Sequence, residues 1–184
     1  MTATATRPPV ETASPRPSPW RYVLFGVVAV FAVFWIYALF FASKEAVNGI
    51  GEEGWTARAQ AICEAAEAER LDLADYREVD AGDPTMLAER GDIVDRATGI
   101  LEQMLDDVVA VQPTGAKGAD LVPQWEADYR TYLEDRRRYA EALRSGENGA
   151  FTESAVDGIP ISDRIAQFAS DNRMPACAPP TDLA

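Results

Sequence analysis

The stretch from Tyr22 to Ala42 reads YVLFGVVAVFAVFWIYALFFA and contains no charged side chain. At about 1.5 Å per residue, a helix of this length spans roughly 30 Å, which is the thickness of the hydrocarbon core of a bilayer. A core helix of a soluble protein would show polar residues every three or four positions, and this stretch lacks that pattern. The sequence therefore predicts a transmembrane helix within residues 20–43.

A cleaved signal peptide is the main alternative for this stretch, because it lies near the N-terminus. The apolar region of a signal peptide is about 7–15 residues long, which is shorter than the run seen here. Phe40 and Phe41 interrupt the small-residue pattern that a cleavage site near Ala42 would need, and no cysteine follows closely for a lipoprotein site. We therefore predict an uncleaved signal anchor.

The charges on the two sides of the apolar stretch predict its orientation. Arg7, Arg16 and Arg21 precede it, whereas Lys44 is the nearest cation after it and stands among glutamates. Flanking arginines and lysines stay in the cytoplasm. Residues 1–19, which are Pro-rich and predicted to be disordered, should thus be cytoplasmic. The residues after the apolar stretch should lie on the extracytoplasmic side of the plasma membrane.

The residues after the apolar stretch are strongly acidic. The whole chain has a net charge of −13 and the residues before the stretch carry +2, so the remainder carries −15. Nucleic acid would repel such a domain, which argues against it as a partner. The chain has no histidine, the usual general base and zinc ligand. No recognisable catalytic or metal motif is present, and we predict no enzyme, no cofactor and no metal site.

The pattern of apolar residues predicts an all-α exported domain over residues 55–178. A Gly-rich hinge (44–54) precedes it and a C-terminal tail (179–184) follows it. Three long helices and one short helix are expected, at 55–80, 84–111, 121–143 and 161–172. Long amphipathic helices joined by short loops are typical of an antiparallel helical bundle. No segment shows the sustained alternation of a strand.

The second of these helices has the clearest signals. Its apolar stripe repeats every seven residues, at Leu87, Val94, Leu101 and Val108. At its start, Asp83 suits the N-cap and the following proline suits the first turn. Gly91 and Gly99 either weaken this helix or permit close helix contact. For the short fourth helix, Ser162 or Asp163 is the expected N-cap.

Cys63 and Cys177 are the two cysteines of the chain, and both follow the predicted anchor. An even number of cysteines in an exported segment favours a disulfide. In an up-down-up-down bundle, the start of the first helix and the end of the fourth lie at the same end, so the two cysteines would be neighbours. Two free buried thiols are the alternative. We predict the bond, which would stabilise the fold by up to roughly 4.7 kcal/mol in the chain-entropy description.

One face of the third helix carries Trp125, Tyr129 and Tyr132, followed by Arg136. Aromatic rings can stack on sugars and a guanidinium can hold an anion, so these four residues are candidates for a ligand or partner surface. The same spacing is more often that of a helix that packs its aromatic residues into the core. Both interpretations remain open from the sequence.

Three segments carry a resemblance to other proteins: Ile62-Cys63, Val111-Gln112-Pro113 with the loop that continues to Trp125, and FASDNRMPACAPPTDL at 168–183. They resemble a set of actinobacterial membrane-anchored or lipoprotein-like helical proteins, in which a cysteine of the first helix faces one after the last. The resemblance implies a helical exported domain and no particular activity. The chain differs from the lipoprotein members in having a span instead of a lipid-modified cysteine.

The leading functional hypothesis is a non-enzymatic, membrane-tethered interaction module of the cell envelope. Its partners would be the lipid bilayer, through the anchor, and an envelope protein or cell-wall polymer. A sensor or small-ligand-binding domain, with a cleft lined by Tyr129, Tyr132 and Arg136, is the first alternative. A hydrolase that uses paired carboxylates is the second.

Overall fold

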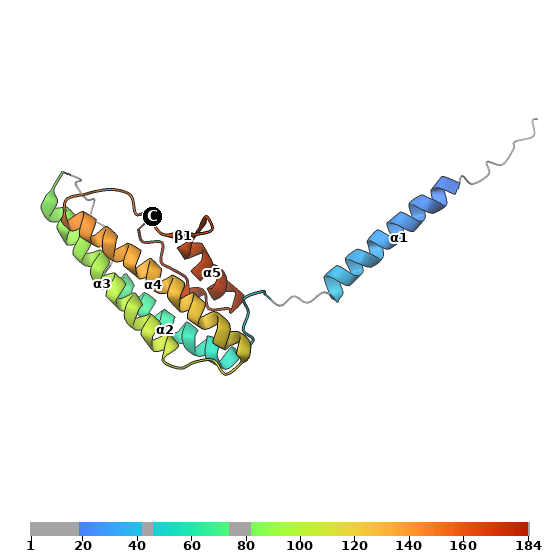
Figure 1. Cartoon of the computed structure of the whole chain (residues 1–184), viewed down its shortest axis with the longest axis horizontal. Coiled ribbons are helices and arrows are strands. Elements are labelled where there is room, and N and C mark those ends of the chain that lie inside the picture. The colour runs from blue at the N-terminus through green and yellow to red at the C-terminus, as the bar shows by residue number, and fades with distance from the viewer. Residues whose placement is uncertain (1–18, 42–45, 74–81, 184) are drawn as a thin grey trace, which may run out of the picture. The chain divides into compact units, whose positions relative to one another are not determined.

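The computed structural model describes residues 19–41, 46–73 and 82–183 of the chain (Figure 1). These residues are mostly helical, which confirms the predicted all-α class. The chain divides into two units, residues 1–44 and 45–184. The predicted cytoplasmic tail at 1–19 lies outside the described residues except for its last residue.

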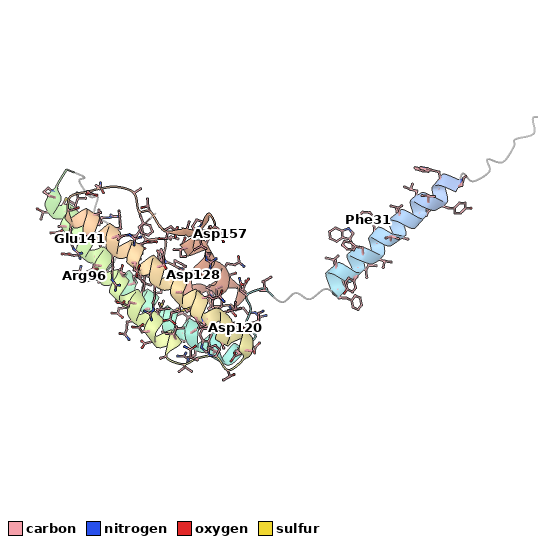
Figure 2. All side chains as sticks on the ribbon, viewed as in Figure 1. Phe31, Arg96, Asp120, Asp128, Glu141 and Asp157 are labelled. Carbon is pink, nitrogen blue, oxygen red and sulfur yellow. A yellow bond between two sulfur atoms is a disulfide. The ribbon has the colours of Figure 1, made fainter. Side chains whose placement is uncertain are left out.

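The helix of the first unit is α1 (Pro19–Phe40), which carries the apolar stretch. None of its residues is buried. Phe31, labelled in Figure 2, is 61% exposed and stands out from the helix, as its apolar neighbours do. Within the described part of the chain, α1 is the one helix that is long and apolar enough to cross a membrane.

The second unit contains the long helices α2 (Glu53–Leu71), α3 (Pro84–Val109) and α4 (Ala116–Arg144), and the shorter α5 (Ile161–Asp171). Figure 1 shows α2, α3 and α4 side by side, and α5 packs against α4. The predicted bounds of the second and fourth helices agree with α3 and α5 to within two residues.

The seven-residue stripe of α3 is buried along its whole length. Leu101 and Val108 belong to the main core, which α2, α4, α5 and the C-terminal residues share. Leu87 and Val94 form a smaller apolar cluster with Ala140 and Leu143 of α4, which we call the small cluster. At the start of α3, the Asp83 carboxylate accepts a hydrogen bond from the backbone N–H of Thr85 at 2.8 Å, as the predicted cap requires.

The two glycines of α3 have different surroundings, and they make a matched pair. A Cβ added at Gly91 would lie 2.7 Å from the backbone oxygen of Ala140, whereas at Gly99 it would meet nothing within 4 Å. We expect Gly91→Ala to push α3 and α4 apart and to lower the free energy of unfolding by about 1–3 kcal/mol. Gly99→Ala should raise it by about 0.5–1 kcal/mol, because alanine is the better helix former. Urea unfolding followed by circular dichroism measures both, and equal effects would contradict the close contact.

The helix predicted at 55–80 corresponds to α2, which ends earlier than predicted, at Leu71. Asp72 follows as the C-cap, and a carboxylate at the negative end of the helix dipole opposes its continuation. Residues 74–80 of the predicted helix lie outside the described residues.

The helix predicted at 121–143 begins five residues earlier, because a distant side chain caps it. Glu52 precedes α2, and its carboxylate accepts hydrogen bonds from the backbone N–H groups of Thr114 and Gly115, both at 2.9 Å. These hydrogen bonds lower the pKa of Glu52. They also satisfy amides at the N-terminus of α4, so the helix starts at Ala116 and contains Pro123 in its interior.

At the start of α5, as at the start of α4, a glutamate that precedes the helix accepts a hydrogen bond from a backbone N–H group. Neither Ser162 nor Asp163 caps α5 as predicted; instead Glu153 accepts a hydrogen bond from the Ser162 backbone N–H at 2.8 Å. Before α5, β1 (Ala155–Val156) pairs antiparallel with β2 (Ile159–Pro160), a short hairpin that the search for sustained alternation did not indicate. Asp157 and Gly158 link them with φ values of 53° and 80°, the conformation of a type I′ turn.

The segment predicted as a hinge is joined to α5 over its described part. The Asn172 side chain accepts a hydrogen bond from the Ile50 backbone N–H at 2.8 Å and donates one to the Asn48 carbonyl at 3.0 Å. Ile50 is buried in the main core. Residues 46–52 therefore belong to the second unit, and residues 44–45 lie outside the described residues.

Candidate functional site

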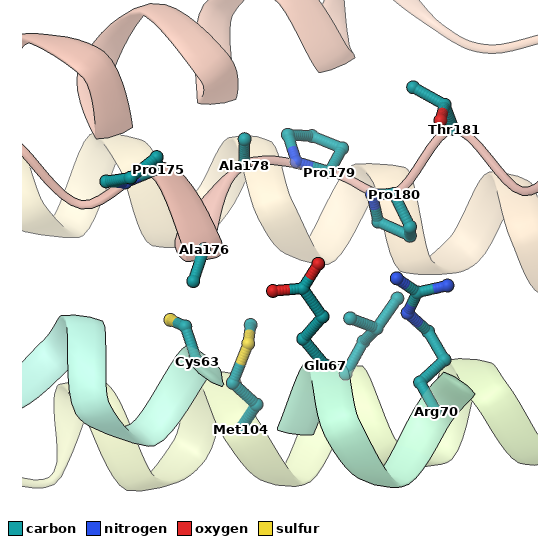
Figure 3. A pocket seen from close by; sticks show the side chains of 11 residues that line it. Cys63, Glu67, Arg70, Met104, Pro175, Ala176, Ala178, Pro179, Pro180 and Thr181 are labelled. Atoms are coloured by element: carbon teal, nitrogen blue, oxygen red, sulfur yellow. The ribbon is translucent and has the colours of Figure 1, made fainter. Parts of the chain in front are cut away.

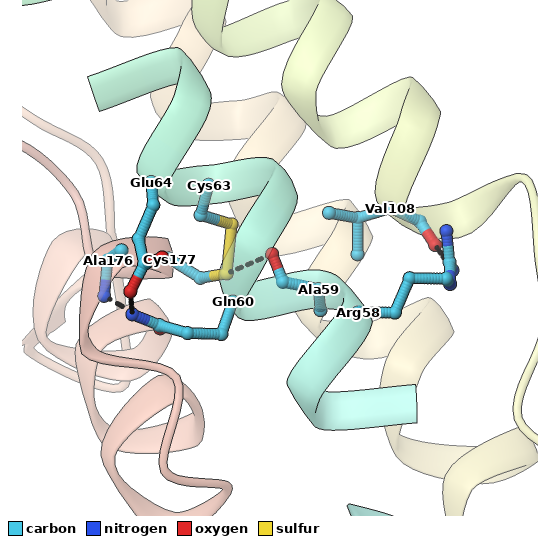
Figure 4. The surroundings of a disulfide bond; sticks show 8 residues. All are labelled: Arg58, Ala59, Gln60, Cys63, Glu64, Val108, Ala176 and Cys177. Atoms are coloured by element: carbon cyan, nitrogen blue, oxygen red, sulfur yellow. Dashed lines mark hydrogen bonds between the residues drawn. A yellow bond between two sulfur atoms is a disulfide. The ribbon is translucent and has the colours of Figure 1, made fainter. Parts of the chain in front are cut away.

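The chain after α5 returns to α2 through the short 3-10 helix η1 (Pro175–Cys177). Cys177 bonds to Cys63 of α2, with the Cα atoms 5.1 Å apart, which is the pairing that the sequence predicts (Figure 4). Both cysteines are fully buried. Beside the bond, the Gln60 side chain accepts a hydrogen bond from the Ala176 backbone N–H at 3.1 Å. The disulfide thus fixes the beginning of the C-terminal segment on α2.

Residues 178–183, which we call the strap, continue from the disulfide across the helices. The Tyr132 hydroxyl donates a hydrogen bond to the carbonyl of Pro180 at 3.1 Å. Two residues later, the Asp182 carboxylate meets arginines from both α2 and α4. Leu183 then packs against the small cluster of α3 and α4. The predicted tail at 179–184 is therefore part of the second unit as far as residue 183, and residue 184 lies outside the described residues.

Arg136 of α4 holds Asp182 with both ends of its guanidinium. Nη1 donates to Oδ1 at 2.7 Å and Nη2 donates to Oδ2 at 3.1 Å, a bidentate arrangement. Arg70 of α2 reaches the same carboxylate, with Nη1 at 3.3 Å from Oδ2. Two cations therefore converge on one carboxylate, and these three groups together carry one positive charge inside an acidic domain.

The Arg136 side chain is fully buried, which is uncommon for an arginine. Its Nε donates to the Thr98 hydroxyl of α3 at 3.0 Å, and its guanidinium carbon lies 5.8 Å from the centre of the Tyr132 ring. Burial alone lowers the pKa of Arg136, but hydrogen bonding and attraction to Asp182 raise it more, so the pKa is raised overall. The arginine stays charged in the core and depends on its carboxylate partner.

A cavity of about 190 Å³ lies between α2 and the strap (Figure 3). Cys63 and Met104 line its floor, and the Glu67 and Arg70 side chains rise from α2 toward the strap. The remaining lining residues are Leu101, Pro175, Ala176, Ala178, Pro179, Pro180 and Thr181. Part of the strap thus covers a cavity beside Arg70, while its two ends pack against the apolar core.

The four residues proposed as a ligand or partner surface are all buried. Trp125 and Tyr132 are 2% exposed, and Tyr129 and Arg136 are 0% exposed. The Trp125 and Tyr129 rings pack edge to face with their centres 5.4 Å apart. These side chains form core, as the alternative interpretation had it, and they expose almost no surface. The cleft expected at Tyr129, Tyr132 and Arg136 is not open, because Tyr132 and Arg136 contact the strap.

Two polar atoms of this core have no hydrogen-bond partner among the described residues, namely Trp125 Nε1 and Tyr129 Oη. Burial is the main cause that raises the pKa of Tyr129, so its hydroxyl keeps its proton. Both groups are donors in an apolar aromatic setting, and each such group costs about 1–3 kcal/mol when it is left unpaired.

Several of the acidic side chains pair with arginines across the helices. Arg144 bonds to both Asp92 and Asp95 of α3, at 2.8 Å and 3.1 Å. Arg164 of α5 similarly bonds to Asp128 of α4 at 3.0 Å. Within the described ranges, no group of three or more His, Cys, Asp or Glu side chains is placed to hold a metal ion. The acids described here tie helices together.

The pKa of Asp182 predicts that the stability contributed by the strap depends on pH. Burial by itself raises this pKa, but Arg136 and then Arg70 lower it more, so the pKa lies below its usual value. The stabilisation from this carboxylate is therefore complete above about pH 4 and is lost as the pH falls through the lower folded-state pKa. We expect the difference in unfolding free energy between wild type and Asp182→Asn to shrink between about pH 7 and about pH 3. Urea titrations at both pH values measure it, and a constant difference would contradict the assignment.

Sequence reasoning missed Asp182 and Arg70 as members of this site. Arg136 was identified, and an arginine on the same helix face as buried aromatic residues is itself a signal that a carboxylate pairs with it. The chain has 30 aspartates and glutamates, and nothing local to Arg136 indicates which one does so. No known protein family, curated protein or solved structure matches the chain.

Proposed function

We propose that the chain is a single-pass membrane protein in which α1 is an uncleaved signal anchor and the second unit lies outside the plasma membrane. The main support for the anchor is that α1 is long and apolar and has no buried residue. Phe25, Phe31 and Val30 are each more than 60% exposed. A bilayer core is the environment that covers apolar side chains on all sides of a helix of this length.

The proposed orientation places the N-terminus in the cytoplasm. It rests on the three arginines before the anchor and on the acidic residues after it. The Cys63–Cys177 pair supports the same orientation, because disulfides persist in oxidising compartments outside the cytoplasm. The resemblance to actinobacterial membrane-anchored proteins also supports a cell-envelope setting.

We propose further that the second unit, an antiparallel helical bundle, is a non-enzymatic interaction module. Its partner is an envelope protein or a cell-wall polymer. The support is the arginine site, where Arg70 of α2 and Arg136 of α4 converge on a single carboxylate in an extended segment, and Thr98 of α3 accepts a hydrogen bond from Arg136. Such a site holds a segment of chain by geometry and charge and requires no bond to be made or broken.

Crosslinking in membranes tests this role. The full chain, an anchor-only version that ends before residue 46, and a chain with an unrelated span in place of α1 are each tagged and captured after mild crosslinking. We expect the full chain and the swapped-anchor chain to recover the same envelope component and the anchor-only version to recover none. If the two longer chains recover nothing beyond the anchor-only version, the interaction role is wrong.

A further inference from the structure

The buried guanidinium of Arg136 is stabilised by an anion beside it. Removing the partner of a buried charge is strongly destabilising, because the charge has lost water and gains nothing in return. Thr98 and Tyr132 supply oxygen atoms to Arg136 but no negative charge. Asp182 supplies the charge, and it comes from the strap rather than from a helix. If the strap leaves, a carboxylate from another segment can take its place and recover the stabilisation.

The strap has the features of a bound peptide. Ala178 has φ −70° and ψ 151°, the polyproline II conformation, and Pro179 and Pro180 follow it with φ fixed near −65°. Thr181 and Asp182 are exposed as residues, and the Asp182 side chain keeps 28% of its surface accessible. Below the strap lies the cavity of about 190 Å³. A segment that is extended, partly exposed and seated over open space can exchange with another of the same kind.

The helices contact the strap at three successive points. The Tyr132 hydroxyl reads the carbonyl of Pro180, the two arginines read the carboxylate of Asp182, and the small cluster takes Leu183. Together they favour an extended segment with a free backbone carbonyl, an aspartate two residues later and an apolar residue after it, and the prolines of the strap hold this conformation. A single aspartate fits this site better than an acidic run would, because the surrounding domain carries a large negative charge.

We propose that Arg70, Tyr132 and Arg136 form a binding site for an aspartate carboxylate in an extended, proline-containing segment of a partner protein. The strap occupies this site in cis until such a segment displaces it. The Cys63–Cys177 bond keeps the displaced strap tethered beside the site, so that it competes at an effective concentration on the order of millimolar. This inference rests on the proposed interaction function and gives it a site and a ligand chemistry.

Peptide binding to the full chain in detergent micelles tests the proposal, and it does not depend on topology or on the crosslinking result. The probe is a capped peptide with the strap sequence APPTDL, and its matched control has asparagine in place of aspartate. The proteins are wild type, a chain that ends after Cys177, and the same shortened chain with Arg136→Met. Capped aspartate alone serves as a small-acid probe. Binding is measured by calorimetry and by the shift in melting temperature.

We expect the shortened chain to bind APPTDL and to melt at a higher temperature in its presence. The asparagine peptide and capped aspartate should each bind at least about tenfold more weakly, since each loses charge-assisted or apolar contacts. Wild type should bind APPTDL at least about tenfold more weakly because its own strap competes. Arg136→Met should abolish binding to the shortened chain.

Four results would overturn the proposal. One is a folded shortened chain that binds no peptide, and another is equal binding of the aspartate and asparagine peptides. The third is capped aspartate binding as tightly as APPTDL, which would make the site one for a small acid. Should the shortened chain not fold, the full-length Asp182→Ala variant takes its place. Failure of APPTDL to raise the melting temperature of that variant is the fourth.

Discussion

Removing the Cys63–Cys177 bond should lower the free energy of unfolding of the second unit by about 2–5 kcal/mol. The two cysteines are 114 residues apart, so the bond closes a loop that spans most of this unit. Long loops gain most from closure, because the unfolded chain loses the most freedom. The bond also fixes the beginning of the strap, and its loss should loosen the contacts of Asp182 as well.

Urea unfolding of the full chain in micelles, followed by circular dichroism, measures this loss. The comparison is between oxidised wild type, wild type with reductant, and Cys63→Ala with Cys177→Ala. Each single variant should lose nearly as much as the double variant, because one cysteine alone cannot form the bond. A double variant as stable as oxidised wild type would contradict the structural role given to the bond.

Asp182→Ala is the second substitution with a large expected effect. It leaves the fully buried Arg136 without its carboxylate, and breaking a buried ion pair in this way costs about 3–5 kcal/mol. The matched control is Asp106→Ala, whose carboxylate pairs with Arg130 at 3.0 Å while both side chains are more than 40% exposed. The control should cost no more than about 1 kcal/mol.

The double variant Arg136→Met with Asp182→Ala tells whether the stability lost in Asp182→Ala comes from the unpaired buried charge or from lost packing. It removes both charges and keeps an apolar side chain of similar length in the core, so it should recover most of the stability lost in Asp182→Ala. Urea unfolding of the three variants beside wild type makes the comparison. If Asp182→Ala costs no more than the Asp106→Ala control, Arg136 does not depend on the strap.

Local signals in the sequence were sufficient for α1 and α3. The uncharged run after Arg21 marks α1, and the spacing of Leu87, Val94, Leu101 and Val108 marks the buried face of α3. The Asp83 cap is also local, because a side chain satisfies amides two and three residues ahead of it. In each case the residues that decide the structure are neighbours in the chain.

The features that sequence reasoning missed depend on residues that are distant in the chain. Glu52 sets the start of α4 from 62 residues away, and Asp182 meets Arg136 from 46 residues away. The crowding at Gly91 comes from Ala140 of another helix, whereas Gly99, in the same helix, is free of it. The hairpin is different, because Asp157-Gly158 is a recognised turn signal. It was missed since strands of two residues show no alternation.

A protease-accessibility experiment tests the proposed membrane topology most directly. One site for a sequence-specific protease, with an epitope tag, is placed before residue 1, and a second is inserted after Asn148 in the exposed loop that follows α4. Intact spheroplasts of a bacterial host are treated with the protease, and lysed spheroplasts serve as the control. We expect cleavage after Asn148 in intact spheroplasts and cleavage at the N-terminal site only after lysis. Cleavage at the N-terminal site alone in intact spheroplasts, or release of a soluble second unit without α1, would contradict the membrane-anchored orientation.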